Sequence, residues 1–130
     1  MPWLGTSPLA TVSRPMLRGE IWLVDLEPVK GSEADKRRPA VVVSNDAANA
    51  TASRLGRGIV TVVPVNSSTH RVYPFQVLLP ATATGLSQDS KAQAEQVRTV
   101  AVQRLGARLG RLPPSIMAEL DEALRLHLTL

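Results

Sequence analysis

Residues 18–44 read RGEIWLVDLEPVKGSEADKRRPAVVVS, and this stretch indicates the fold. Residues 20–26 and 40–44 are rich in β-branched and other apolar side chains, a composition typical of strands. Pro39 stands before the second run, and a strand start is one of the few sheet positions that tolerates a residue without a backbone N–H. The connector at 28–38 is mostly polar and charged. We therefore predict two strands joined by an exposed loop, a kind of segment that often carries functional residues.

The rest of the chain continues as short strands and ends in a helix. Residues 58–65 are almost entirely apolar, which is typical of a central strand buried on both faces. Further strands are predicted at 73–79, 90–95, 96–100 and 108–112, and a short surface helix or turn at 45–52. Pro113 and Pro114 precede a helix whose apolar residues recur at spacings of three and four. This order predicts a mainly β fold, a small antiparallel curled sheet or barrel with a C-terminal helix.

Length and composition indicate one soluble domain with an anionic partner. The first seventeen residues contain three prolines and lack the long apolar centre of a secretory signal. We therefore predict a flexible extension at 1–17 and a single domain at 18–130. No apolar run approaches the roughly 20 residues that a membrane helix needs, so we expect a cytoplasmic protein without membrane contact. The net charge of +4 favours binding to a polyanion such as nucleic acid.

Metal and cofactor chemistry is not expected from this composition. The chain has no cysteine, which excludes disulfides and thiolate zinc sites. Its two histidines, His70 and His127, are far apart in the sequence, so a histidine-rich metal centre is not expected either. His70 lies in a polar loop and has the side chain for proton transfer near neutral pH. His127 is expected to pack on the terminal helix, so we do not predict a two-histidine mechanism.

The order of the motifs resembles a known family. GEIW at 19–22 is followed by D-x-x-P-x-x-GSE at 25–33, RPAVVVS at 38–44, VPV at 63–65, YPFQV at 73–77 and EQVRTV at 95–100. In this order they resemble the MazF/PemK/Kid toxins of type II toxin-antitoxin systems, over residues 16–130. The resemblance implies an SH3-like barrel of the MazF/CcdB type. It also implies a metal-independent, sequence-specific endoribonuclease that cuts single-stranded RNA and leaves 2′,3′-cyclic phosphate and 5′-hydroxyl ends.

The resemblance assigns catalytic roles to charged residues. Arg38 matches the family's catalytic arginine, and a guanidinium can stabilise the charge that develops on a phosphate. We also expect Arg38 to protonate the leaving oxygen. Glu33 matches the family's loop glutamate, and either Glu33 or Glu95 is the candidate general base, since an arginine stays protonated. From the residues alone, a solvated charged loop is the favoured interpretation, and only the resemblance shifts the balance towards catalysis.

Two motifs depart from the family pattern. Many relatives have threonine where Asn66 stands; Asn66 and Ser67 can hold a phosphate oxygen, but both types are also common in turns. Gln93 stands where some relatives carry an arginine that works with the acid at Glu95, so that acid–base pair is absent. Tyr73 is the candidate for base stacking, whereas Trp22 and Phe75 are expected in the core. The candidate RNA-binding residues are Lys36, Arg37, Ser68, Tyr73, Gln93, Gln96 and Arg98.

The resemblance also implies partners and leaves two alternatives. The implied partners are single-stranded RNA, a second copy of the chain in a homodimer, and a cognate MazE-like antitoxin with an acidic tail. One alternative is a gyrase-poisoning toxin of the same fold, as in the CcdB relatives, although the GSE…RP and EQVRT motifs favour the nuclease. The other is a catalytically weak protein that only binds RNA or antitoxin, because of Asn66.

Overall fold

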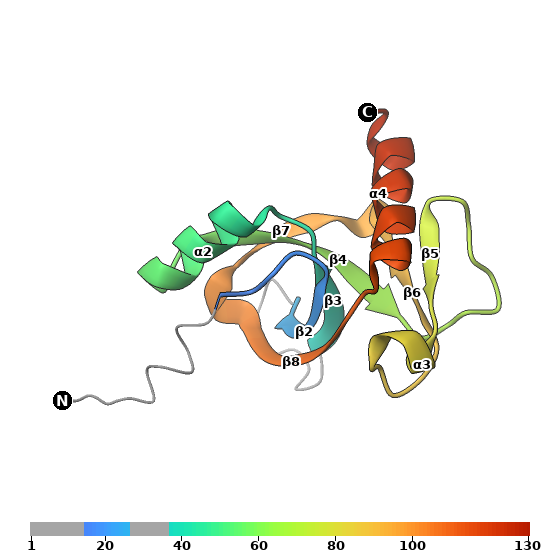
Figure 1. Cartoon of the computed structure of the whole chain (residues 1–130), viewed down its shortest axis with the longest axis horizontal. Helices are drawn as coiled ribbons and strands as arrows, with labels where there is room; N and C mark the ends of the chain where they lie inside the picture. Colours follow the sequence, from blue (N-terminus) through green and yellow to red (C-terminus); the bar gives the residue numbers. More distant parts are fainter. Residues whose placement is uncertain (1–14, 27–36) are drawn as a thin grey trace.

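The computed structural model describes residues 15–26 and 37–130, and Figure 1 shows their arrangement. The elements are β2 (Glu20–Asp25), β3 (Arg37–Val42), α2 (Asp46–Leu55), β4 (Ile59–Asn66), β5 (Gln76–Leu79), α3 (Ala81–Thr84), β6 (Ser90–Gln93), η1 (Ala94–Gln96), β7 (Arg98–Ala101), η2 (Val102–Arg104), β8 (Leu105–Arg111) and α4 (Pro114–Leu128). Seven strands of the described ranges form one sheet in the order β5-β6-β4-β3-β2-β8, with β7 paired to β4. The predicted mainly β fold with a terminal helix is confirmed.

Strand β4 is the centre of this sheet, as its apolar sequence predicts. It pairs antiparallel with β3, and its first half pairs with β7 through Ile59 to Val62. Its last two residues, Val65 and Asn66, pair with Ala92 and Lys91 of β6. The β4 valines are buried, since each of Val60, Val62, Val63 and Val65 is at most 3% exposed. Strand β4 therefore belongs to two parts of the sheet, one with β3 and β7 and the other with β6 and β5. Its last residues lie at the junction of these two parts, which we call the junction of the two sheets.

The strand boundaries differ from the prediction where local turns intervene. Strand β3 begins at Arg37, so Pro39 lies inside it, opposite Leu23. The pairing of β3 with β4 begins only at Ala40, so Pro39 has one strand neighbour, and there a missing N–H is tolerated. Strand β5 begins at Gln76 rather than Tyr73, because the N–H of Gln76 bonds to the Tyr73 carbonyl and closes a turn.

Two segments form short helices that the sequence analysis did not predict. Residues 81–84 form α3, whose first N–H donates to Asp89 Oδ1 at 2.8 Å. The strand predicted at 90–95 stops at Gln93, and Glu95 lies on the 3₁₀ turn η1. The segment predicted as a short helix or turn at 45–52 is a helix: Asn45 Oδ1 accepts from the Ala48 N–H, and Gly56 ends α2 with a φ of 67°.

Two apolar clusters lie on opposite faces of the sheet. One contains Val41, Val63 and Val65 and packs under α4 through Ile116, Leu120 and Ala123. The other contains the alternating residues Ala40, Val42, Val60 and Val62, together with Met16 and Ala52. Side chains alternate between the two faces of a strand, so this division assigns each β3 and β4 position to one face. We call the face opposite α4, at the end of β4, the open face.

The two ends of the described chain pack differently from each other. Residues 15–17 belong to the predicted extension, and there Met16 is 4% exposed, so the packed chain includes it. At the other end, Leu128 continues the three- and four-residue spacing of apolar residues on the terminal helix, yet it is 48% exposed. Figure 1 shows the C-terminal end of α4 projecting beyond β5. Among the described residues, no helix is both long and apolar enough to span a membrane.

Candidate functional site

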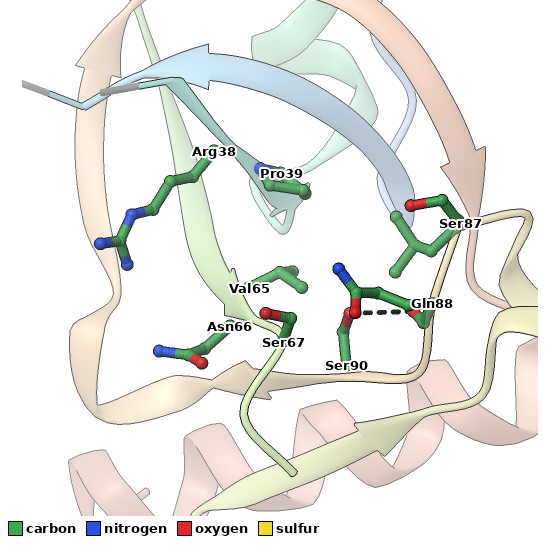
Figure 2. A pocket seen from close by; sticks show the side chains of 9 residues that line it. Arg38, Pro39, Val65, Asn66, Ser67, Ser87, Gln88 and Ser90 are labelled. Carbon is green, nitrogen blue, oxygen red and sulfur yellow. Dashed lines mark hydrogen bonds between the residues drawn. The ribbon is translucent and has the colours of Figure 1, made fainter. Parts of the chain in front are cut away.

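Arg38 and Asn66 lie on the same face of the sheet and line the same pocket. Ala40 of β3 lies opposite Pro64 of β4, and the pairing of the two strands ends there. Arg38 is two residues before Ala40 and Asn66 is two residues after Pro64, so by alternation both lie on the open face. Figure 2 shows their side chains on one side of a pocket, both extending away from Ser87 and Gln88. A guanidinium and a carboxamide are thus presented together at the junction of the two sheets.

The pocket beside these two residues is open and has mixed polarity. It encloses about 290 Å³, and its lining residues are Arg38, Pro39, Val65, Asn66, Ser67, Leu86, Ser87, Gln88 and Ser90. The residues at 86–90 come from the connection between α3 and β6, and Ser90 Oγ donates to the Gln88 carbonyl at 3.0 Å. Three distant segments of the chain therefore build one cavity, with the cation at one side and apolar, hydroxyl and amide side chains around the rest.

Arg38 is exposed, and within the described ranges its guanidinium makes no hydrogen bond or ion pair. Such a guanidinium keeps all its donors for an oxyanion, which it can bind with two parallel N–H groups. Its neighbour Arg37 points to the other face, as adjacent strand residues do, and lines a different pocket of about 710 Å³ with Asp25 and Arg104. The structure therefore separates the two arginines that the sequence placed side by side.

Asn66 takes part in the turn that follows β4. Its Oδ1 accepts from the Ser68 N–H at 2.7 Å, and Ser68 Oγ lies 3.2 Å from His70 Nδ1. The carboxamide oxygen is therefore engaged, and the Nδ2 group is the part left to donate to a ligand. Ser67 is exposed and lines the pocket. Both sequence interpretations of Asn66, turn residue and phosphate ligand, fit this geometry.

Glu95 is held by two amide side chains, one of which the sequence analysis missed. Glu95 Oε2 accepts from Gln76 Nε2 at 2.8 Å and lies 3.4 Å from Gln93 Nε2. Glu95 Oε1 is buried and has no hydrogen-bond donor among the described residues. Gln76 is itself 8% exposed, and its position opposite Gln93 could be found only from the strand register. The arrangement orients one carboxylate oxygen and leaves the other to accept a hydrogen bond or a proton.

Tyr73 lies in a stack that the sequence analysis predicted only in part. Its ring is 5.4 Å from the Phe75 ring with an interplanar angle of 4°. Arg71 lies 5.7 Å from the Tyr73 ring centre, and its Nη1 donates to Tyr73 Oη at 3.1 Å. Phe75, predicted in the core, is instead half-buried in this stack, because β5 begins only at Gln76. Tyr73 is 42% exposed, so part of the ring remains accessible.

The remaining predicted residues lie in different places. Arg98 Nη1 donates to the Leu26 carbonyl at 3.1 Å, so this arginine bonds to the end of β2. Gln96 is exposed on η1, next to Glu95. Glu33 and Lys36 lie outside the described residues. His70 and His127 are both exposed. Within 15–26 and 37–130, no three histidine or acidic side chains are grouped to hold a metal ion.

Comparison with known proteins identifies the family. A model of the PemK-like, MazF-like toxins of type II toxin-antitoxin systems matches residues 17–128. The chain belongs to this family. The endoribonuclease MazF9 of Mycobacterium tuberculosis is 65% identical to this toxin over 115 residues, which cover 88% of this chain and 98% of that protein. The endoribonuclease EndoA of Bacillus subtilis is 34% identical over 113 residues, 87% of this chain and 94% of that protein.

Solved structures resemble the toxin in fold. MazF of Deinococcus radiodurans superposes with a TM-score of 0.71 and 29% identity, over 90% of this chain and 99% of that one. A mycobacterial endoribonuclease, solved in complex with its cognate antitoxin, superposes with a TM-score of 0.65 and 26% identity, over 88% and 96% of the two chains. The predicted family and the predicted MazF-type fold are confirmed.

Proposed function

We propose that this toxin cuts single-stranded RNA at the junction of β3 and β4, with Arg38 stabilising the charge on the scissile phosphate. The observation that carries the proposal is the exposed Arg38 guanidinium, which is unpaired within the described residues and lines the same pocket as Asn66. The prediction of an endoribonuclease toxin is confirmed by the family match and by the relatives. The residue roles below are our proposal.

The proposed reaction needs no nucleophile from the protein. The ribose 2′-hydroxyl attacks the adjacent phosphorus, the 2′-oxygen loses its proton to a base, and the bond to the 5′-oxygen breaks. The products are a 2′,3′-cyclic phosphate and a 5′-hydroxyl. Arg38 binds the phosphate oxygens as negative charge builds on them and gives the leaving oxygen its proton. The Nδ2 group of Asn66 and the hydroxyl of Ser67 are donors for the same phosphate.

Glu95 is our candidate for the base among the described residues. Gln76 fixes Oε2, and Oε1 has no donor among the described residues. Oε1 is buried in the free chain, so its role as the base requires that RNA binding brings the 2′-hydroxyl into contact with it. Glu33 lies outside the described residues and stays an alternative. Comparing the pH–rate profiles of Glu95→Gln and Glu33→Gln decides between them. The variant that replaces the true base loses the dependence of kcat on an ionised carboxylate, whereas the other variant keeps it.

Partners follow from the same proposal. We propose a cytoplasmic homodimer that binds a MazE-like antitoxin with an acidic tail. A solved mycobacterial relative is in complex with its cognate antitoxin, and a net charge of +4 suits acidic ligands. Leu126 and Leu128 are 57% and 48% exposed on α4 in the single chain, which leaves apolar surface for a second copy to cover. Sedimentation of the toxin alone, and then with its antitoxin, tests both partners.

The central experiment is RNA cleavage in excess EDTA with mapping of the 5′ ends. We expect discrete cuts with 5′-hydroxyl ends, and a loss of about 10²- to 10³-fold in kcat for Arg38→Ala, as for other lost oxyanion donors. Arg57→Ala is the matched control, because Arg57 is an exposed arginine on the connection between α2 and β4. Cleavage by Arg38→Ala at the rate of the Arg57→Ala control contradicts the proposal.

One observation favours the weak-enzyme alternative. The Asn66 oxygen is engaged with the Ser68 N–H, so this side chain has fewer ways to contact RNA than a free hydroxyl has. The substitution Asn66→Thr tests it with the same RNA and the same mapping of ends. A large gain in kcat shows that Asn66 limits the native toxin. An equal or lower rate removes this alternative.

A further inference from the structure

Lys91 is a nearly buried cation on the open face of the sheet. It lies in the middle of β6, directly opposite Asn66 of β4 on one side and Leu78 of β5 on the other. Residues directly opposite each other share a face, so Lys91 is on the face of Asn66 and Arg38 rather than beneath α4. Lysines on strand surfaces normally extend their charge into water, yet Lys91 is only 8% exposed. Its burial therefore needs a structural reason.

The reason is a contact with the connection between β4 and β5. Lys91 Nζ donates to the main-chain carbonyl of Arg71 at 2.8 Å. Strand β4 ends opposite Lys91, β5 begins opposite Gln93, and β6 lies between them in the sheet. The connection at 67–75 must therefore pass from one side of β6 to the other. The ammonium of Lys91 holds this connection near its middle.

The residue held by Lys91 also orients the aromatic stack. Arg71 contacts the ring and the hydroxyl of Tyr73, which stacks on Phe75. The N–H of Tyr73 donates to Gln76 Oε1 at 3.1 Å, and Gln76 Nε2 in turn binds Glu95. A continuous series of contacts thus runs from Lys91 through the stack to the carboxylate. Displacing the Arg71 carbonyl would move the accessible ring of Tyr73 relative to Glu95.

We propose that Lys91 is a positioning residue for RNA: by holding the Arg71 carbonyl it fixes the Tyr73–Phe75 stack, on which a base next to the cut stacks. The ligand is a nucleobase, whose flat face matches an exposed aromatic ring. The inference deepens the proposed function and rests on it for the identity of the ligand. The positioning itself is a property of the free protein and is testable without RNA.

The first test uses the rings themselves. The chain has one tyrosine and one phenylalanine, so the NMR signals of Tyr73 and Phe75 are assigned without ambiguity. In Lys91→Met, which keeps a long apolar side chain, we expect both sets of ring resonances to lose the ring-current shifts of the stack. In Arg57→Met, which removes a positive charge at an exposed position, we expect no change. Unchanged ring signals in Lys91→Met overturn the proposal.

The second test is a double-mutant cycle on binding. The probe is a single-stranded oligonucleotide that carries the mapped cleavage site, with a 2′-deoxy sugar at the cut so that it binds but is not cleaved. We expect Tyr73→Ala to weaken binding by about fivefold or more, the effect of one stacked base, and Lys91→Met to weaken it by a similar factor. Because Lys91 acts through the stack, the double variant should bind within about twofold of Tyr73→Ala alone.

Independent losses that multiply in the double variant overturn the positioning role, because Lys91 would then contact RNA by itself. Failure of the proposed function is distinguishable from this result, since it appears as unchanged cleavage in Arg38→Ala. The Arg57→Met control corrects both binding measurements for the general loss of positive charge, which weakens any nucleic-acid complex. A drop in Lys91→Met that the control reproduces in full also counts against the positioning role.

Discussion

Gly110 of β8 provides a sharp test of how the segment that lines the pocket is held. A Cβ atom at this position would lie far inside van der Waals contact with the main-chain carbonyl of Thr84, at the end of α3. The carbonyl would have to move by about 1 Å to restore an ordinary C···O contact of about 3.3 Å. Since α3 leads directly into residues 86–90 of the pocket, Gly110→Ala strains the segment that carries Ser87 and Gln88.

The cost follows from how firmly α3 is held. Thr84 is 3% exposed, its Oγ1 donates to the Pro80 carbonyl at 2.8 Å, and the first N–H of α3 binds Asp89. Overpacking of such a site costs about 1–3 kcal/mol, and the lower entropy of an unfolded alanine offsets about 0.4–1 kcal/mol of that. We therefore expect Gly110→Ala to lower the free energy of unfolding by about 1–2 kcal/mol.

Gly106 is the matched control because it lies in the same strand. A Cβ there would be 3.4 Å from the nearest atom, the Leu23 carbonyl oxygen, so Gly106→Ala should leave the free energy of unfolding unchanged or raise it by up to about 1 kcal/mol through the lower entropy of the unfolded alanine. Urea unfolding at one protein concentration, followed by tryptophan fluorescence, measures both variants. Equal midpoints for Gly110→Ala and Gly106→Ala would refute the reasoning that the α3–β8 contact leaves no room for a methyl group.

Two further substitutions test buried polar contacts. Asn49→Ala removes a fully buried amide that donates to the Ser44 carbonyl at 2.9 Å and accepts from Ser44 Oγ. We expect the free energy of unfolding, measured in urea, to fall by about 2–3 kcal/mol. An equal fall for Thr51→Ala, at an exposed position on the same helix, would contradict this. Glu20, 4% exposed, accepts from Trp22 Nε1 at 3.1 Å and pairs with Arg108 at 3.0 Å. Glu20→Gln should lower the free energy of unfolding by about 1–2 kcal/mol, a value kept small because solvent screens the partly exposed Arg108. A double-mutant cycle with Arg108→Met that shows no coupling energy would disprove the ion pair.

Much of the site was predictable because its signals are local. The RP motif places Arg38 at a strand start, and the run at 58–65 predicts a central strand that ends in Asn66. Capping residues predicted α2, and paired prolines predicted the start of α4. Each of these signals depends on residues within about one turn or one strand of each other, which is the range over which propensity and periodicity act.

The partners of the site residues depend instead on strand order. Gln76 binds Glu95 only because β5 pairs with β6, and Arg98 reaches the Leu26 carbonyl across 72 positions of sequence. From the sequence alone, Lys91 would be expected to be an ordinary exposed cation. Its contact with the Arg71 carbonyl arises because β6 lies between β4 and β5 in the sheet.

The sequence by itself determined the family, the approximate positions of the strands, the terminal helix and the identity of the residues that could contact a phosphate. Only the tertiary structure decided that Arg38 and Asn66 line one pocket while Arg37 lines another, and that the Lys91 ammonium is buried against the Arg71 carbonyl. The physical reason is that alternation along a strand specifies which residues share a face. Which strands become neighbours, and in which register, depends on how the whole set of apolar faces is buried at once.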